Sequence, residues 1–218
     1  MFQLFFFIGL LALLLYLLLP KYLLSIYRRY RGDVYWKEVQ PYKHHYPVAW
    51  VVWLFFLASL GITELTAQHV FYLLFIAFLL SLSWLDLKLR ILADELVLAL
   101  AVSGLLYHYF VLDGSILLRL AIVMLWGTCA KIFQVSAAVL KLRRLEHCFG
   151  AGDTKLLLAL LCWFDTLTVL HILTVACCLA LAVVGFCSVF FKKTIRSVAF
   201  GPFLSFAAYF MWWFEKVV

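Results

Sequence analysis

Charged residues are scarce in this chain. Asp, Glu, Lys and Arg make up 13% of its 218 residues, whereas hydrophobic residues make up 67%. Soluble domains are typically about 25% charged and about 45–50% apolar, so a soluble chain of this length could not bury so much apolar surface. The apolar runs also lack the period-two alternation of a transmembrane β-barrel. The composition therefore predicts an all-α, polytopic membrane protein surrounded by membrane lipids.

Long apolar runs follow one another along the whole chain. The 154–164 run is short for a span of about 20 residues, so we expect it to tilt or to start inside the bundle. No basic segment or small-residue cleavage site accompanies the first run, which we interpret as an anchor rather than a signal peptide. The runs predict about eight transmembrane helices, over residues 2–19, 47–62, 69–86, 91–112, 115–140, 154–164, 167–191 and 198–214. We divide the chain into an anchor helix with a short basic loop, 1–47, and a membrane-embedded core, 48–218.

Positive charge is distributed unevenly between the predicted loops. Short cytoplasmic loops of membrane proteins collect Lys and Arg. This rule places the basic loops in the cytoplasm and the N-terminus outside, and it accounts for the net charge of +7 without a nucleic-acid partner. Lys and Arg gather in 20–46, 86–90, 141–155 and 192–196, whereas the loops near 63–68, 113–114 and 165–166 carry none.

Cysteine motifs for disulfides or zinc are missing. The sequence contains six cysteines, none of which belongs to a C-x-x-C pair, and five of them fall within predicted spans. Small apolar packing explains them better than metal binding does. We therefore expect no metal site and no cofactor.

Acidic residues are few enough to be considered one by one. Most of the eleven lie in predicted loops or at chain ends, where solvation accounts for them. Ionisable residues at membrane depth are costly, so those near helix ends are candidates for function. Four acids lie at or near the cytoplasmic ends of predicted helices: Asp86, Asp94, Glu95 and Asp153.

Asp86 ends one predicted helix and Asp153 begins another, at similar depth in this topology. Two carboxylates brought together there could share one proton, which is how aspartic proteases activate water and protonate the leaving amine. Gly150 and Gly152 lie just before Asp153. Glycine at these positions permits positive φ, or a close approach of the backbone to the carboxylate or to a bound peptide.

Explanations without peptide hydrolysis remain open. Asp94 and Asp153 could be first-turn acids favoured by the helix dipole, and Asp86 could pair with Lys88 or Arg90. A proton-coupled transporter could also use Asp86 and Asp153, although transporters bind their substrates near the bilayer midplane and these acids lie at one face.

Three stretches of the sequence carry a resemblance to one family. LDLKLRILADELVLAL at 85–100, GAGDTKLLLALLCWF at 150–164 and FGPFLSFAAYF at 200–210 resemble, in order and spacing, motifs of the prepilin peptidases. These type IV leader peptidases are membrane aspartic proteases of the G-x-G-D class. Together with the helices between them, the resemblance covers about 80–218.

The resemblance implies a function and a location. It implies an aspartic endopeptidase of the bacterial inner membrane, with its active site facing the cytoplasm, that removes a short basic leader from prepilin or pseudopilin precursors. In this interpretation Asp86 and Asp153 are the catalytic pair. The supporting or substrate-binding candidates are Gly150, Gly152, Asp94 and Lys155, of which Lys155 could bias the protonation of Asp153 and Asp94 could cap a helix.

Two departures from the family pattern matter. Ala93 stands where the family usually has a proline, before the acid that follows the first aspartate. Many members also carry a cysteine-rich, zinc-binding cytoplasmic region associated with N-methylation of the product, whereas the 20–47 loop here has no cysteine. The missing cysteines speak against zinc binding and against methylation of the product. A presenilin-like intramembrane protease is the other relative considered, but Trp84-Leu85-Asp86 and Gly201-Pro202-Phe203 replace its Tyr-Asp and Pro-Ala-Leu motifs.

Overall fold

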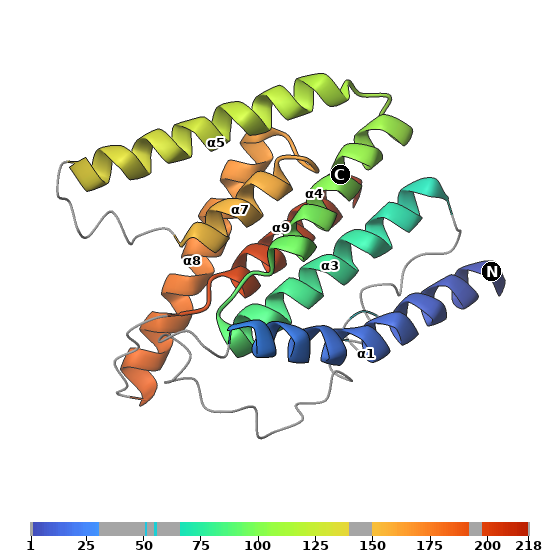
Figure 1. Cartoon of the computed structure of the whole chain (residues 1–218), viewed down its shortest axis with the longest axis horizontal. Coiled ribbons are helices and arrows are strands. Elements are labelled where there is room, and N and C mark those ends of the chain that lie inside the picture. Colours follow the sequence, from blue (N-terminus) through green and yellow to red (C-terminus); the bar gives the residue numbers. More distant parts are fainter. Residues whose placement is uncertain are drawn as a thin grey trace.

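The computed structural model describes residues 2–30, 51, 55, 66–139, 150–191 and 198–217. These residues form helices and turns, without a strand among them, which confirms the all-α prediction. Figure 1 shows the helices in one bundle. They are α1 (Phe2–Tyr30), α3 (Ala67–Leu89), α4 (Asp94–Phe110), α5 (Ile116–Val139), α7 (Ala151–Leu160), α8 (Thr166–Phe191) and α9 (Gly201–Val217).

Six of the predicted helices correspond to observed helices, with ends that differ by a few residues. The short 154–164 run becomes α7, a helix of 10 residues. At 1.5 Å per residue it is about 15 Å long, roughly half the hydrocarbon thickness of a bilayer. The short length expected of this run is therefore confirmed, whereas its tilt and its start inside the bundle stay predictions.

The first helix is longer than predicted. The expected end near residue 19 is wrong, because α1 passes through Pro20 and continues to Tyr30. A proline inside a helix removes one backbone hydrogen bond. Leu19 and Tyr22, on either side of Pro20, both pack against the cluster around Trp84 and Leu85 of α3. Packing on both sides of the proline thus favours one continuous helix.

The described helices include three that are long and apolar enough to cross a membrane: Ala67–Leu87, Ile116–Ser136 and Thr166–Phe190. The chain is accordingly a multi-pass membrane protein. The predicted helix over 47–62 lies outside the described residues, apart from Val51 and Phe55. Both of these side chains are buried, against residues of α1 and α3.

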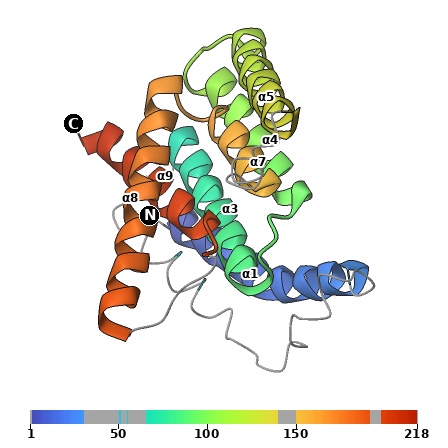
Figure 2. The ribbon, with the colours of Figure 1, turned by 90° about the vertical axis from the view of Figure 1, so that its left-hand side faces the viewer.

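Helix α3 lies at the centre of the bundle. It packs against α4 and α9, and α1 lies along its outer side. Figure 2 shows α8 and α9 on one side of α3, and α4, α5 and α7 on the other. The short α7 contacts α4, α5 and α9. This arrangement brings together the ends of helices that are distant in sequence.

Aromatic rings fill the centre of the core. Phe75, Tyr107, Trp163 and Trp212 form a continuous cluster, with ring centroids 4.7–5.6 Å apart. The Trp163 indole N–H donates to the Leu100 carbonyl at 2.7 Å, so its polar atom is satisfied. A Cβ on Gly104 would lie 2.6 Å from the Trp163 ring, so glycine at this position lets α4 and Trp163 approach closely.

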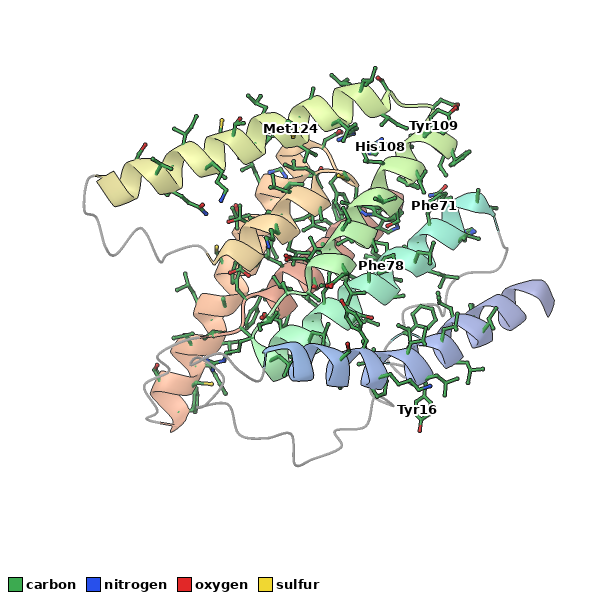
Figure 3. The ribbon with its side chains drawn as sticks, in the orientation of Figure 1. Tyr16, Phe71, Phe78, His108, Tyr109 and Met124 are labelled. Atoms are coloured by element: carbon green, nitrogen blue, oxygen red, sulfur yellow. The ribbon has the colours of Figure 1, made fainter. Side chains whose placement is uncertain are left out.

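Apolar side chains also cover the outside of the bundle. Met124 on α5 is 69% exposed, and Tyr16 on α1 is 53% exposed. Figure 3 shows these two labelled residues on the outer sides of their helices. On α5, which is long and apolar enough to span a membrane, side chains of this kind face lipid rather than water. The inner core and this outer surface together explain the high apolar content of the sequence.

An ion pair fixes the turn between α7 and α8. The Arg119 guanidinium of α5 donates to the Phe164 carbonyl at 2.9 Å and to the Asp165 carboxylate at 2.5 Å. Sequence reasoning assigned Asp165 to solvent, whereas the structure also pairs it with this cation. The turn thus fixes the C-terminal end of α7, whereas Asp153 lies near its N-terminal end.

Candidate active site

Asp86 lies in the last turns of α3 and is 6% exposed. Its Oδ2 accepts a hydrogen bond from the backbone N–H of Gly201 at 2.8 Å, although the two residues are 115 positions apart in sequence. Helix α3 ends immediately afterwards, where Arg90 adopts a left-handed conformation with φ 53° and its N–H donates to the Asp86 carbonyl. The carboxylate is therefore held between the end of α3 and the start of α9.

Gly201 leaves the space that Asp86 occupies. A Cβ at this position would lie 2.7 Å from Oδ2 and 3.2 Å from Cβ of Asp86, closer than real side-chain contacts. Sequence reasoning used the FGPFL stretch as a family motif and did not identify Gly201 as a site residue. Gly201 could have been suspected from the sequence, because it is a glycine followed by a proline at the start of a predicted helix.

Asp153 is the third residue of α7, and Gly150 is the N-cap residue of that helix. The Asp153 carboxylate accepts a hydrogen bond from the Gly150 amide. An acid three positions after the N-cap residue that bonds back to its N–H forms half of a capping box. A Cβ on Gly150 would lie 3.0 Å from Asp153 Oδ2, so glycine makes room for this folded-back carboxylate.

The two glycines before Asp153 are needed because neighbouring side chains lie close to them, and not because they adopt an unusual backbone conformation. Gly150 has φ −61° and ψ 141°, and positive φ is confined to non-glycine residues in the described part of the chain. The alternative that these glycines take positive φ is therefore wrong. A Cβ on Gly152 would lie 3.2 Å from Cδ1 and 3.3 Å from Cβ of Leu92, in the turn between α3 and α4. Gly152 thus lets the start of α7 pack onto the turn that follows Asp86.

The two carboxylates influence each other electrostatically. Burial, and secondly the negative charge of Asp86, raise the pKa of Asp153 to about 6, while the hydrogen bond from Gly150 opposes the rise. A carboxyl group with such a pKa exchanges protons near neutral pH, as a general acid or base requires. The structure thus brings together two acids from helices that are separated by more than sixty residues of sequence.

Comparison with known proteins identifies the family. The sequence profile of the type IV leader peptidase family matches residues 73–185, just over half of the chain, and this range includes both Asp86 and Asp153. The chain belongs to the type IV leader peptidase family. The peptidase is therefore a member of an aspartic prepilin peptidase family. No curated protein and no solved structure matches the chain.

The other two predicted site residues of the peptidase pair with each other. Lys155 Nζ lies 2.7 Å from Oδ1 and 2.9 Å from Oδ2 of Asp94, and both side chains are exposed. The expectation that Asp94 caps a helix is wrong, since Ala93 is the N-cap residue of α4 and makes no side-chain cap. Lys155 directs its ammonium group toward Asp94. This exposed ion pair joins the start of α4 to the start of α7.

Glu95 provides a second connection at the start of α4. The Tyr22 hydroxyl of α1 donates to Glu95 Oε2 at 2.9 Å. The first turn of α4 therefore contacts both α1 and α7 through consecutive acids. Across the residues that the structure describes, the peptidase has no group of three or more His, Cys, Asp and Glu side chains that could hold a metal ion.

Proposed function

We propose that the protein is a membrane-embedded endopeptidase that removes the short basic leader from type IV prepilin-like or pseudopilin precursors, with Asp86 and Asp153 as its catalytic pair. The observation that carries the proposal is the electrostatic coupling of two acids at neighbouring helix ends, within the matched family region. Family membership supports leader cleavage in general. The assignment of these two residues is our own.

The chemistry of two coupled carboxylates suits hydrolysis of a peptide bond. One ionised carboxylate takes a proton from water, while the other, neutral carboxyl donates a proton to the peptide carbonyl oxygen. Water then attacks directly, and no covalent bond forms between enzyme and substrate. Because the two groups share protons, their titrations belong to the pair and need a separate argument to be assigned.

The position of the pair suits the boundary of a membrane substrate. A prepilin-like precursor, as the family implies, has a basic leader in the cytoplasm followed by an apolar helix in the membrane. Asp86 lies at the end of the candidate span Ala67–Leu87, and Asp153 lies at the start of the apolar α7. We propose that this end of the bundle faces the cytoplasm of a bacterial inner membrane, where the bond to be cut would enter the site.

Co-expression with a candidate prepilin tests the proposal. N-terminal sequencing of the product should show a single cut that removes the leader, and the new N-terminus should be unmethylated. Asp86→Asn and Asp153→Asn should each leave the precursor intact while inserting into the membrane as the wild type does. A protein that instead carries pH-driven flux in proteoliposomes, without cleaving any precursor, would be a transporter.

A further inference from the structure

A cavity of about 330 Å³ lies between α5, α7 and α8. Figure 1 shows α7 between these two longer helices, each of which contains a candidate membrane span. Few residues of either span are buried inside the bundle, so the cavity lies between surfaces that the described helices leave largely uncovered. Its lining includes Leu157, Leu158 and Leu161 of α7, Ala130 of α5 and Leu170 of α8.

One end of the cavity lies beside the candidate active site. A Cβ on Gly127 of α5 would lie 3.7 Å from Leu158 of α7, and the two helices run in opposite directions. Seven residues on from Gly127 is Gln134, and seven residues back from Leu158 is the start of α7. Gln134 and Thr154 both line the cavity, and Thr154 directly follows Asp153. A peptide held at Asp153 would therefore have this cavity next to it.

The lining of the cavity suits apolar side chains. Among the described residues that line it, none is charged, and most are apolar. The cavity thus offers no counter-charge to a basic leader, whereas the apolar segment that follows the leader could be buried there. A helix with its side chains is about 10–12 Å across, so a cavity of this volume takes side chains from one face of a helix and not the whole helix.

Gln134 favours a peptide over a lipid chain as the occupant. It lies in the candidate span Ile116–Ser136, is half-buried, and makes no hydrogen bond to any other residue that the structure describes. A polar group at membrane depth is costly without a partner. A carboxamide both donates and accepts, and the first N–H groups of a helix have no partner within that helix. The start of a substrate helix can pair with Gln134, whereas an acyl chain cannot.

We propose that this cavity binds the first apolar side chains after the cleaved bond of the substrate, and that the Gln134 amide hydrogen-bonds the peptide backbone at the start of the substrate helix. This binding site rests on the proposed peptidase function. It assigns α5 and α8 to holding the membrane segment of the substrate, while α7 brings the bond to be cut next to Asp153. Selection among precursors then depends on the size and polarity of the side chains that enter the cavity.

Filling the cavity tests this assignment by kinetics. Ala130→Phe places a ring inside it, so KM for a purified prepilin should rise about tenfold while kcat changes less than about threefold. Ala121→Phe is the matched control, because the same change lies on an exposed part of α5 outside the cavity and should leave both constants unchanged. An unchanged KM in Ala130→Phe would overturn the proposal.

A second variant tests the hydrogen bond to the peptide backbone. Gln134→Leu keeps the approximate size of the side chain and removes its donor and acceptor, so KM should rise several-fold. A KM equal to that of the wild type would overturn the role of Gln134.

Disulfide cross-linking tests binding without catalysis. Cys129 lines the cavity and is exposed. Prepilins with single cysteines at successive positions, mixed in membranes with the Asp153→Asn variant and mildly oxidised, should link to Cys129 from the first few positions after the cleaved bond and not from the leader. Adding Ala130→Phe should remove most of this product, whereas adding Ala121→Phe should not.

The cross-linking result separates the binding site from the proposed reaction. Links to Cys129 from a precursor that the wild type never cleaves would count against the peptidase function and support the binding site. Normal cleavage, with no link to Cys129 from any position, would overturn the binding site and leave the cavity to lipid.

Discussion

The two carboxylates of the site are held in different ways. Asp153 bonds to an amide three positions earlier in its own helix, whereas Asp86 bonds to an amide 115 positions away at the start of α9. The first arrangement forms with a single turn of helix, and the second exists only when α3 and α9 are packed together. The comparison shows that one half of the pair is built locally and the other half depends on the tertiary fold.

The largest effect should come from removing either carboxylate. Asp86→Asn and Asp153→Asn should each reduce cleavage by at least about a hundredfold, because each removes one of the two proton-transfer groups. Turnover of a purified prepilin, with expression checked in parallel, measures this loss. More than a few per cent of wild-type turnover in either variant would remove that residue from the pair.

Alanine substitutions of the three glycines next to the site should reduce cleavage to different extents, according to the contact that each added Cβ would make. Gly201→Ala should be the most harmful, since its Cβ would press on the buried Asp86 at 2.7 Å. Gly152→Ala should follow, because its Cβ would meet Leu92 at 3.2 Å, and Gly150→Ala should be the mildest, because the Asp153 carboxylate at 3.0 Å can rotate away.

We expect losses from about a hundredfold for Gly201→Ala to a few-fold for Gly150→Ala, by comparison with other misplaced catalytic groups. Turnover measured under identical conditions gives the ranking. If Gly150→Ala were the most damaging of the three, the local contact would matter more than the tertiary one, and the comparison between the two acids would be reversed.

Thermal stability should reveal how much the ionised Asp153 carboxylate, buried beside Asp86, destabilises the folded protein. Its pKa is about 6 in the folded protein against an ordinary 3.8, so the folded state binds this proton more tightly between these pH values. Stability should therefore be highest below the ordinary pKa and should fall as pH rises through about 6. Asp153→Asn removes this penalty, so its unfolding temperature should exceed that of the wild type at pH 7.5 and match it near pH 4.

Asp86→Asn is the comparison variant, because it keeps an oxygen that can accept the hydrogen bond from the Gly201 amide. Unfolding curves of both variants in the same detergent, at the two pH values, measure the difference. An Asp153→Asn protein that is less stable than the wild type at pH 7.5 would show that its ionised carboxylate is stabilising.

The smallest effect should come from the exposed ion pair. Exposed salt bridges contribute roughly 0–1 kcal/mol, so Lys155→Ala and Asp94→Asn should each lower the free energy of unfolding by at most about 1 kcal/mol and change turnover by less than about fivefold. Turnover and unfolding measured for the wild type, the two single variants and the double variant give a double-mutant cycle, which isolates the interaction between the two side chains. A tenfold rise in KM for either single variant, with kcat unchanged, would instead place that residue in contact with the substrate.

The sequence predicted the local features of the fold because apolar runs in lipid have few alternatives to helix. Most helix ranges could be predicted from these runs, and the two acids could be selected because they lie at helix ends. The continuation of α1 through Pro20 could not be predicted, since it depends on packing of Leu19 and Tyr22 against α3. The partnership of Gly201 and Asp86 was missed for the same reason. It is a contact between distant segments, and neither residue's neighbours in sequence indicate it.

The close contact between Gly104 and Trp163 has an evolutionary consequence. A Cβ on Gly104 would lie 2.6 Å from the indole ring and 2.9 Å from the backbone carbonyl carbon of Cys162, so every amino-acid substitution at this position adds atoms where none fit. A smaller residue in place of Trp163 would remove the contact with the ring but not the contact with the backbone of Cys162. Among descendants of this chain, we therefore expect position 104 to remain glycine, whichever residue stands at position 163.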